Sequence, residues 1–223
     1  DLAVARVPFY RDLLPGSPSV RNADELAQLP LTERAALASA TLEDRRATPV
    51  STGTLVKRTS GSSGRYLVVE RSPRAAWWQG ILELRRNHAR GLRPWERTVA
   101  IRVDPDVRLR HGLLGWAATR ASVLDAADDP AVLAAAVRRA SPAAVRPRVV
   151  GTGGQMLSDA DRQAIEAAWH RPALDLYGAV EVGTIAWQCP AADLYHVDHD
   201  SVLVEVLDDR GRPCAPGEAG EVV

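Results

Sequence analysis

Lysine is almost missing from this chain of 223 residues: Lys57 is the only lysine among its 28 basic residues, and all the others are arginines. An enzyme that needs a catalytic lysine therefore has a single candidate here. Two cysteines are too few for a disulfide scaffold, so a cytosolic setting is the default expectation. The chain also has no excess of one charge, because 28 acidic residues balance the basic ones. Proteins that bind nucleic acids or membrane surfaces usually carry a basic excess. No apolar run approaches the roughly 20 residues that span a bilayer, and we expect neither partner.

What remains is an ordinary globular composition, with 46% hydrophobic and 25% charged residues and enough length to bury a core. The chain up to about Ala47 is predicted to form short helices, one of them capped by Thr32. A stretch rich in Ser, Thr and Gly follows over 48–64, and is predicted to form a loop or short hairpin. Residues 66–70 form an apolar, β-branched run typical of a strand.

A longer helix is predicted to start at Ser72-Pro73 and to run to about Arg90. Its apolar residues recur at helical spacing and are expected to face the core. These residues are Trp77, Gly80, Ile81 and Leu84.

The rest of the chain alternates between strand and helix patterns. Strands are predicted at 98–103, 122–124, 148–150 and 174–176, helices at 129–140 and 158–170, and further apolar segments at 202–207 and 220–223 around a turn at 208–211. This alternation predicts an α/β fold of layered sheets and helices with a β-rich C-terminal end. We divide it into a helical segment (1–47), an α/β core (48–195) and the start of a β-rich subdomain (196–223).

One loop has the composition of an anion-binding site. Thr59, Ser60, Gly61, Ser62, Ser63, Gly64 and Arg65 are consecutive. Glycines let backbone N–H groups converge on an anion, hydroxyl groups add donors, and an arginine adds charge. The loop is no Walker motif, because G-K-[ST] is absent and a strand follows it. A flexible surface turn is an equally good interpretation of this loop alone.

Two further motifs favour the anion-binding interpretation of this loop over the surface turn. The turn Gly151-Thr-Gly-Gly154 follows a predicted strand and precedes a capped helix, where backbone can approach a flat ligand. The element Asp175-Leu-Tyr-Gly-Ala-Val-Glu181 places an aromatic ring, a glycine and a carboxylate just after another strand. Each has a structural alternative: a tight turn for the glycines, a core aromatic for Tyr177 and a surface acid for Glu181.

In this order and spacing the three motifs resemble the adenylate-forming, AMP-binding acyl-CoA synthetase superfamily, and within it the phenylacetate–CoA ligase-like branch. The resemblance runs from about Leu29 to Val223. It implies that Thr59 to Arg65 clamp the phosphates of ATP and that Gly153 and Gly154 lie against the adenine. It also implies that Tyr177 and Gly178 pack on the adenine and that Glu181 binds Mg²⁺. Arg65 and Glu181 are then the catalytic residues.

The implied reaction joins an aromatic or other small carboxylic acid to ATP and passes the acyl group to coenzyme A. A carrier protein as acceptor stays open, as does a homodimer. A non-catalytic nucleotide-binding or scaffold module of the same fold is the competing interpretation. It is motivated by Arg65, Gln155 and Val180, which stand where the family usually has Lys, Glu and Ser or Thr.

Two expectations concern what surrounds the three motifs. The sequence stops before the family's ribose-binding Asp and its lid domain, so we expect a piece of a larger N-terminal domain. Lys57 lies upstream of the phosphate loop, which is the wrong place for the adenylation lysine of that lid. Cys189, His196 and His199 invite a zinc site, but spacing provides no fourth ligand, and packing at the start of the β-rich end is the favoured interpretation.

Overall fold

The structure is a computed structural model that describes residues 2–16, 18–59, 66–93, 97–100, 121–126 and 147–223. It divides into two compact units, residues 1–80 and residues 81–223. No helix in these described ranges is long and apolar enough to cross a membrane. The predicted helix at 129–140 and the end of the predicted strand at 98–103 lie outside the described residues.

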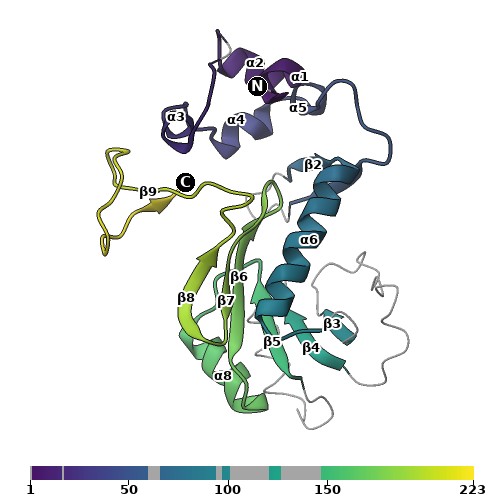
Figure 1. The fold of residues 1–223 in the computed structure, drawn as a ribbon, viewed down its shortest axis with the longest axis vertical. Coiled ribbons are helices and arrows are strands. Elements are labelled where there is room, and N and C mark those ends of the chain that lie inside the picture. Colours follow the sequence, from purple (N-terminus) through teal and green to yellow (C-terminus); the bar gives the residue numbers. More distant parts are fainter. Residues whose placement is uncertain (1, 17, 60–65, 94–96, 101–120, 127–146) are drawn as a thin grey trace. The chain divides into compact units, whose positions relative to one another are not determined.

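The first unit begins with five short helices, which confirms the helical prediction up to Ala47 (Figure 1). They are α1 (Leu2–Arg6), α2 (Pro8–Leu13), α3 (Ala23–Ala27), α4 (Arg34–Ser39) and α5 (Leu42–Arg45). The predicted cap at Thr32 is wrong by one position, because α4 follows Glu33, whose side chain makes no capping bond. Thr41 instead forms a capping box with Asp44 at the start of α5.

A two-stranded hairpin completes the sheet structure of the first unit. Strand β1 (Leu55–Arg58) pairs antiparallel with β2 (Val68–Arg71). The guanidinium of Arg46, just after α5, binds the carboxylate of Glu70 in β2 through two hydrogen bonds. These bonds lower the pKa of Glu70. The hairpin is therefore tied to the helical segment by a charge-assisted pair.

Helix α6 (Pro73–Ala89) has the predicted bounds, and the hydroxyl of Ser72 accepts a hydrogen bond from the backbone N–H of Ala75 at its start. The predicted buried face is wrong. Trp77 and Leu84 are 66% and 56% exposed, whereas Leu82 and Arg86 are buried. Because Leu82 and Arg86 are four residues apart they share one side of the helix, and an ion pair described below holds that side in place.

The second unit is built on a six-stranded sheet in the order β3-β4-β5-β6-β7-β8 (Figure 1). Its strands are β3 (Arg97–Ala100), β4 (Ala121–Ala126), β5 (Val149–Gly153), β6 (Ala173–Ala179), β7 (Gly183–Cys189) and β8 (Ala192–Val197). The pairs β3–β4, β4–β5 and β5–β6 are parallel, whereas the pairs β6–β7 and β7–β8 are antiparallel. The mixed α/β prediction is confirmed.

Helices cover both faces of this sheet. Helix α8 (Asp159–Trp169) is capped by Ser158 as predicted, and its Arg162 donates to the side chain of Gln188 in β7. The neighbouring Trp187 donates its indole N–H to Asp198, which also binds Arg86 of α6. Successive strand residues point to opposite faces, so α8 and the end of α6 lie on opposite sides of β7.

The strands differ from the sequence prediction in four places. β5 continues through Gly151 to Gly153, so most of the predicted glycine turn is strand. β6 continues to Ala179, so Tyr177 and Gly178 lie within the strand instead of after it. β7 and β8 were not predicted. The predicted strand at 202–207 shrinks to β9 (Val206–Leu207), which pairs with β10 (Glu221–Val222) around the predicted turn.

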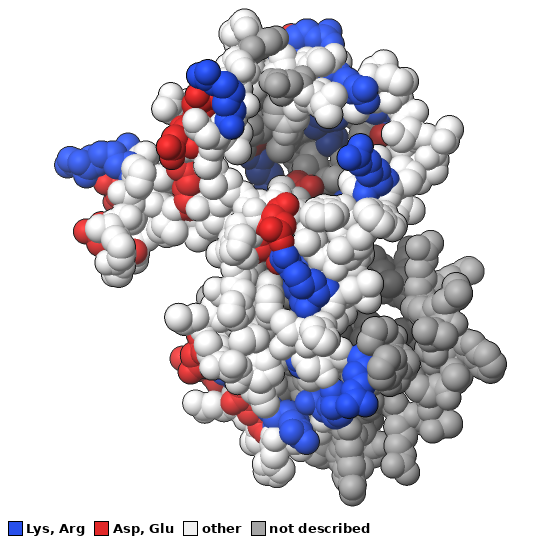
Figure 2. All heavy atoms as spheres, viewed as in Figure 1, with Lys and Arg blue, Asp and Glu red and all other residues white. Residues whose placement is uncertain are grey.

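The surface agrees with the balanced charge of the sequence. On the face shown in Figure 2, the described Lys and Arg side chains lie among Asp and Glu side chains.

Candidate functional site

The carboxyl ends of β5 and β6 bring two of the three predicted motifs together. Gly153, the last residue of β5, pairs with Leu176 in β6, and Tyr177 is the next residue of β6. The glycine motif Gly151–Gly154 therefore ends beside the part of β6 that carries Tyr177. In open sheets with parallel strands, ligands bind outside the carboxyl ends of the strands, and this edge is the candidate site.

The geometry of the edge suits a flat ligand. Gly154 has a φ of 82°, in the left-handed region that favours glycine. Gly154 is exposed, whereas Gly153 is buried at the end of β5, and Tyr177 is 47% exposed. Glu181 lies in the turn between β6 and β7 and is partly exposed. The edge therefore offers the exposed backbone of Gly154, an aromatic ring and a carboxylate.

Gly178 has a packing reason for being glycine. A Cβ atom there would lie 2.6 Å from the carbonyl oxygen of Gly183 and 3.1 Å from the Cα of Thr184. Both are backbone atoms of β7, and the pairing of β6 with β7 shifts register between Tyr177 and Gly178. Gly178 thus lets β7 approach closely enough to close the turn that carries Glu181.

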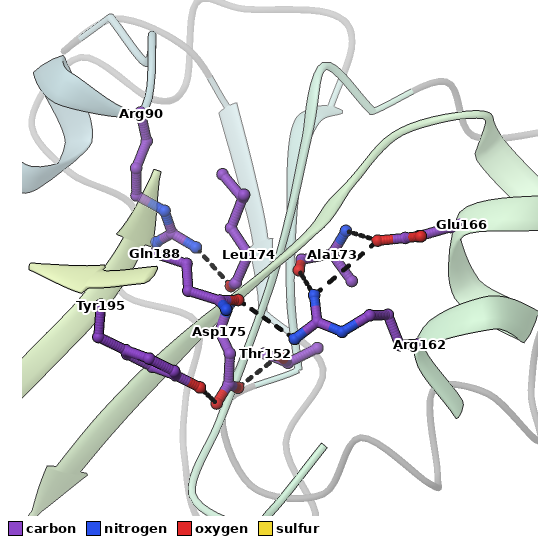
Figure 3. A network of polar contacts seen from close by, with 9 residues as sticks. All are labelled: Arg90, Thr152, Arg162, Glu166, Ala173, Leu174, Asp175, Gln188 and Tyr195. Atoms are coloured by element: carbon purple, nitrogen blue, oxygen red, sulfur yellow. Dashed lines mark hydrogen bonds and ion pairs between the residues drawn. The ribbon is translucent and has the colours of Figure 1, made fainter. Parts of the chain in front are cut away.

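A row of polar side chains, most of them buried, joins the strands of this sheet (Figure 3). The hydroxyl of Thr152 in β5 and that of Tyr195 in β8 each donate to the carboxylate of Asp175 in β6, at 2.6 Å. The side-chain oxygen of Gln188 in β7 accepts from the backbone N–H of Asp175 at 3.0 Å. The row thus joins four adjacent strands.

The row also joins the sheet to helix α8 (Figure 3). Arg162 donates to the carbonyl oxygen of Ala173 at 2.6 Å and to the side chain of Gln188 at 3.2 Å. Glu166 accepts from the backbone N–H of Ala173 at 3.0 Å. These bonds hold the start of β6 against α8 and fix the strand on which Tyr177 stands.

The phenol of Tyr195 acts as a hydrogen-bond donor to the carboxylate of Asp175. Burial, and secondly the hydrogen bond to Asp175, raise the pKa of the Tyr195 phenol above its usual value. The phenol therefore keeps its proton at neutral pH. Asp175 is buried and Thr152 is fully buried, so water reaches the carboxylate poorly from the side of Thr152, whereas its second donor, Tyr195, is partly exposed.

The two hydroxyl donors of Asp175 should contribute unequally to stability. Thr152→Val keeps the volume of a fully buried side chain but removes its hydroxyl, so we expect a loss of about 1–3 kcal/mol in the free energy of unfolding. Tyr195→Phe should cost less, because Tyr195 is 43% exposed and water can replace its hydroxyl. Urea denaturation of both variants measures the difference. Equal losses would show that the burial of Thr152 is irrelevant to the bond.

The third predicted motif belongs to the first unit. Thr59 directly follows β1, and its backbone N–H donates to the carbonyl oxygen of Leu67 at 3.0 Å. Its hydroxyl oxygen accepts from the N–H of Leu67 at 2.8 Å and from the guanidinium of Arg34 in α4 at 3.0 Å. Thr59 is buried and joins the two ends of the predicted phosphate loop. The remaining residues of that loop, Ser60, Gly61, Ser62, Ser63, Gly64 and Arg65, lie outside the described residues.

The sequence interpretation missed Thr152, Asp175, Gln188 and Tyr195 as a connected set, and Arg34 as a neighbour of Thr59. A signal was present for two of them: Thr152 and Asp175 are polar residues inside otherwise apolar strands, a pattern that indicates a buried partner. For the zinc alternative, the structure places Cys189 next to His196, and the described residues contain no group of three or more side chains suited to a metal ion.

Solved structures with a similar fold include CoA ligases. One is an open conformation of a 2-hydroxyisobutyryl-CoA ligase in complex with 2-HIB-AMP and CoA, with a TM-score of 0.76 and 18% identity over the whole of this chain. The chain has the fold of the adenylate-forming acyl-CoA ligases. It covers 61% of the length of that ligase.

Two further structures share less of this fold. The anthranilate CoA ligase AuaEII in complex with anthranoyl-AMP has a TM-score of 0.54 and 17% identity, over 75% of this chain and 38% of its own. An acyl-CoA synthetase from Brucella canis has a TM-score of 0.50 and 19% identity, over 93% and 42% of the two chains. No protein-family model and no curated protein matches the sequence.

Proposed function

We propose that this chain is the nucleotide-binding part of an adenylate-forming ligase. It would activate a small carboxylic acid with ATP, giving an acyl-adenylate and pyrophosphate, and pass the acyl group to coenzyme A. One observation carries the proposal: Gly153 pairs with the residue before Tyr177, so the exposed Gly154 follows β5 near the half-exposed ring of Tyr177, at the carboxyl edge of a sheet with the CoA-ligase fold. Such an edge can hold an adenine between peptide planes and an aromatic face.

Each site residue has a role in this proposal. Tyr177 would stack on the adenine, with Gly178 allowing the turn behind it to close. The polar row through Asp175 would keep the strands beneath that ring in register. Thr59, with Ser60 to Arg65, would hold the phosphates. The same proposal includes a small carboxylic acid as the substrate. It also includes the assignment of the chain to the phenylacetate–CoA ligase-like branch of the superfamily, which rests on the sequence motifs.

Glu181 fits the magnesium role in one respect. A magnesium ion on a nucleotide usually takes one or two protein carboxylates and receives its other ligands from phosphates and water. The turn between β6 and β7 provides one partly exposed carboxylate, Glu181, and no cluster of three acidic, His or Cys groups occurs among the described residues. When bound, the ion would supply charge neutralisation at the phosphates.

Nucleotide binding can be tested at Tyr177. Stacking between a base and an aromatic side chain is worth about 1–3 kcal/mol, so we expect Tyr177→Ala to weaken AMP binding by roughly 10-fold in calorimetry. Trp78→Ala is the matched control, because Trp78 is an exposed aromatic of similar exposure, 42%, on α6. If both variants bind AMP as the unaltered chain does, Tyr177 does not contact the base.

A pyrophosphate-exchange assay with ATP and a panel of carboxylic acids separates the ligase from a non-catalytic nucleotide-binding module. Val180 and Gln155 favour the latter, because they remove a hydroxyl and a charge from the edge. The assay is run on the whole gene product. AMP binding without exchange for any acid would support the module. With exchange established, the thiol that accepts the acyl group, coenzyme A or a carrier protein's phosphopantetheine, is identified by mass spectrometry.

A further inference from the structure

Cys189 and His196 form a close pair at the opposite end of β7 from the candidate site. The Sγ atom of Cys189 lies 3.0 Å from Nε2 of His196 in β8. The turn that carries Glu181 precedes the other end of β7. Seven residues of strand separate the two ends, a distance of about 20 Å at the usual rise. The pair is therefore separate from the proposed nucleotide edge, and the inference below does not depend on the proposed function.

The imidazole of His196 packs against a buried aromatic side chain. Its ring lies against the indole of Trp187 with ring centroids 4.7 Å apart and planes tilted by 32°. Trp187 is buried, and its indole N–H donates to the fully buried Asp198 at 3.2 Å. His196 is exposed and Cys189 is half-buried. A reagent in solvent can thus reach the thiol while the histidine stays in place beside it.

A thiol next to an imidazole is chemically different from an isolated thiol. The thiolate is the nucleophilic form of cysteine. A neighbouring imidazole that takes the thiol proton increases the fraction of cysteine present as thiolate. The distance of 3.0 Å between Sγ of Cys189 and Nε2 of His196 is short enough for this proton transfer. The second cysteine lacks such a partner: Sγ of Cys214 lies 3.7 Å from the carbonyl oxygen of Ala219, and no imidazole contacts it in the described part of the chain.

We propose that Cys189 and His196 form a nucleophilic thiol pair, which makes Cys189 a modification site for low-molecular-mass disulfides and other soft electrophiles. His196 takes the thiol proton, and the sulfur of Cys189 attacks one sulfur of the disulfide. A new S–S bond forms to Cys189 while the old S–S bond breaks. The released thiolate takes up the proton, so Cys189 is oxidised and the leaving sulfur is reduced. The same sulfur displaces iodide from iodoacetamide.

The test compares the two cysteines within one molecule. The folded full chain is treated briefly with limiting iodoacetamide at neutral pH in the presence of EDTA, and tryptic peptides are quantified by mass spectrometry. Cleavage after Arg210 separates Cys189 from Cys214. We expect Cys189 to react about 10-fold faster than Cys214. In concentrated urea, which removes the folded arrangement, the two rates should converge.

His196→Gln provides the second arm. It keeps a polar side chain on an exposed position but cannot accept the thiol proton, and the reaction rate of Cys189 should fall to near that of Cys214. Circular dichroism confirms that the variant is folded. Oxidised glutathione is then used as the disulfide probe and should modify Cys189 in the unaltered chain first. Equal rates for the two cysteines in the folded chain, or a rate of Cys189 that His196→Gln leaves unchanged, would overturn the proposal.

Discussion

Asp198→Ala is expected to lower the free energy of unfolding by about 3–5 kcal/mol, the usual cost of breaking a buried ion pair by removing one partner. The Asp198 side chain is fully buried and accepts three hydrogen bonds. They come from Arg86 at 2.6 Å, from Arg85 at 3.0 Å and from the indole of Trp187 at 3.2 Å. Without the carboxylate, the buried guanidinium of Arg86 would lose its counter-charge and the indole its acceptor.

Asp200→Ala is the matched control for this prediction. Asp200 also forms an ion pair with Arg85, but its side chain is 44% exposed and that of Arg85 is 48% exposed. Exposed pairs of this kind contribute about 0–1 kcal/mol. Urea denaturation followed by tryptophan fluorescence measures both variants. Similar losses for Asp198→Ala and Asp200→Ala would mean that burial does not decide the strength of this cluster.

Gly178→Ala is expected to destabilise the second unit by about 1–3 kcal/mol, the range for forcing extra volume into a packed site. The added Cβ would meet the backbone of β7 at 2.6 Å, and backbone cannot move aside as a flexible side chain can. We therefore expect β6 and β7 to separate where they carry Tyr177 and Glu181. Nucleotide affinity, if the proposed function holds, should fall with stability.

Gly80→Ala is the control for Gly178→Ala, because it also replaces a glycine with alanine but at a position without a close neighbour. Gly80 lies inside helix α6, and a Cβ there meets nothing within 4 Å. Alanine in a helix interior is more favourable than glycine by roughly 0.5–1 kcal/mol, so this variant should be as stable as the unaltered chain or more stable. Both variants are compared by their urea denaturation midpoints. A Gly178→Ala variant of unaltered stability would show that the β6–β7 contact is not tight.

The sequence predicted those elements whose signals are local. The boundaries of α6 and α8 follow from Ser72-Pro73 and Ser158, because a capping side chain binds backbone only two or three residues away. The strands at 98–103, 122–124 and 148–150 follow from short apolar runs with β-branched residues. Each is found within a few residues of its prediction where the structure describes it.

The buried face of α6 required information that the helix alone does not contain. Hydrophobic spacing favoured Trp77 and Leu84, and both are exposed. The side that is buried carries Arg86, whose partner Asp198 lies 112 residues away in the chain. A charge in the core is stable only with such a partner, and no periodicity in 73–89 indicates where the partner is.

The extent of β6 and the existence of β7 and β8 were missed for a similar reason. Tyr177 and Gly178 have the composition of a turn, yet pairing with β7 keeps them in the strand. Composition did identify Gly153, Gly154 and Tyr177 as candidates. Their adjacency depends on the pairing of β5 with β6, which links residues more than 20 positions apart and is set by the sheet as a whole.

The single lysine has a practical consequence for work in solution. Lys57 lies on the exposed strand β1, two residues before Thr59. Since guanidinium groups do not react with amine-directed esters under mild conditions, such a dye has one side-chain target in the whole chain. Besides the α-amino group of the chain, which such esters also modify, the unaltered protein can thus be labelled at one known side chain, on the hairpin that leads into the Ser/Gly loop. Fluorescence from that dye would follow the hairpin during titration with ATP, without any engineered attachment point.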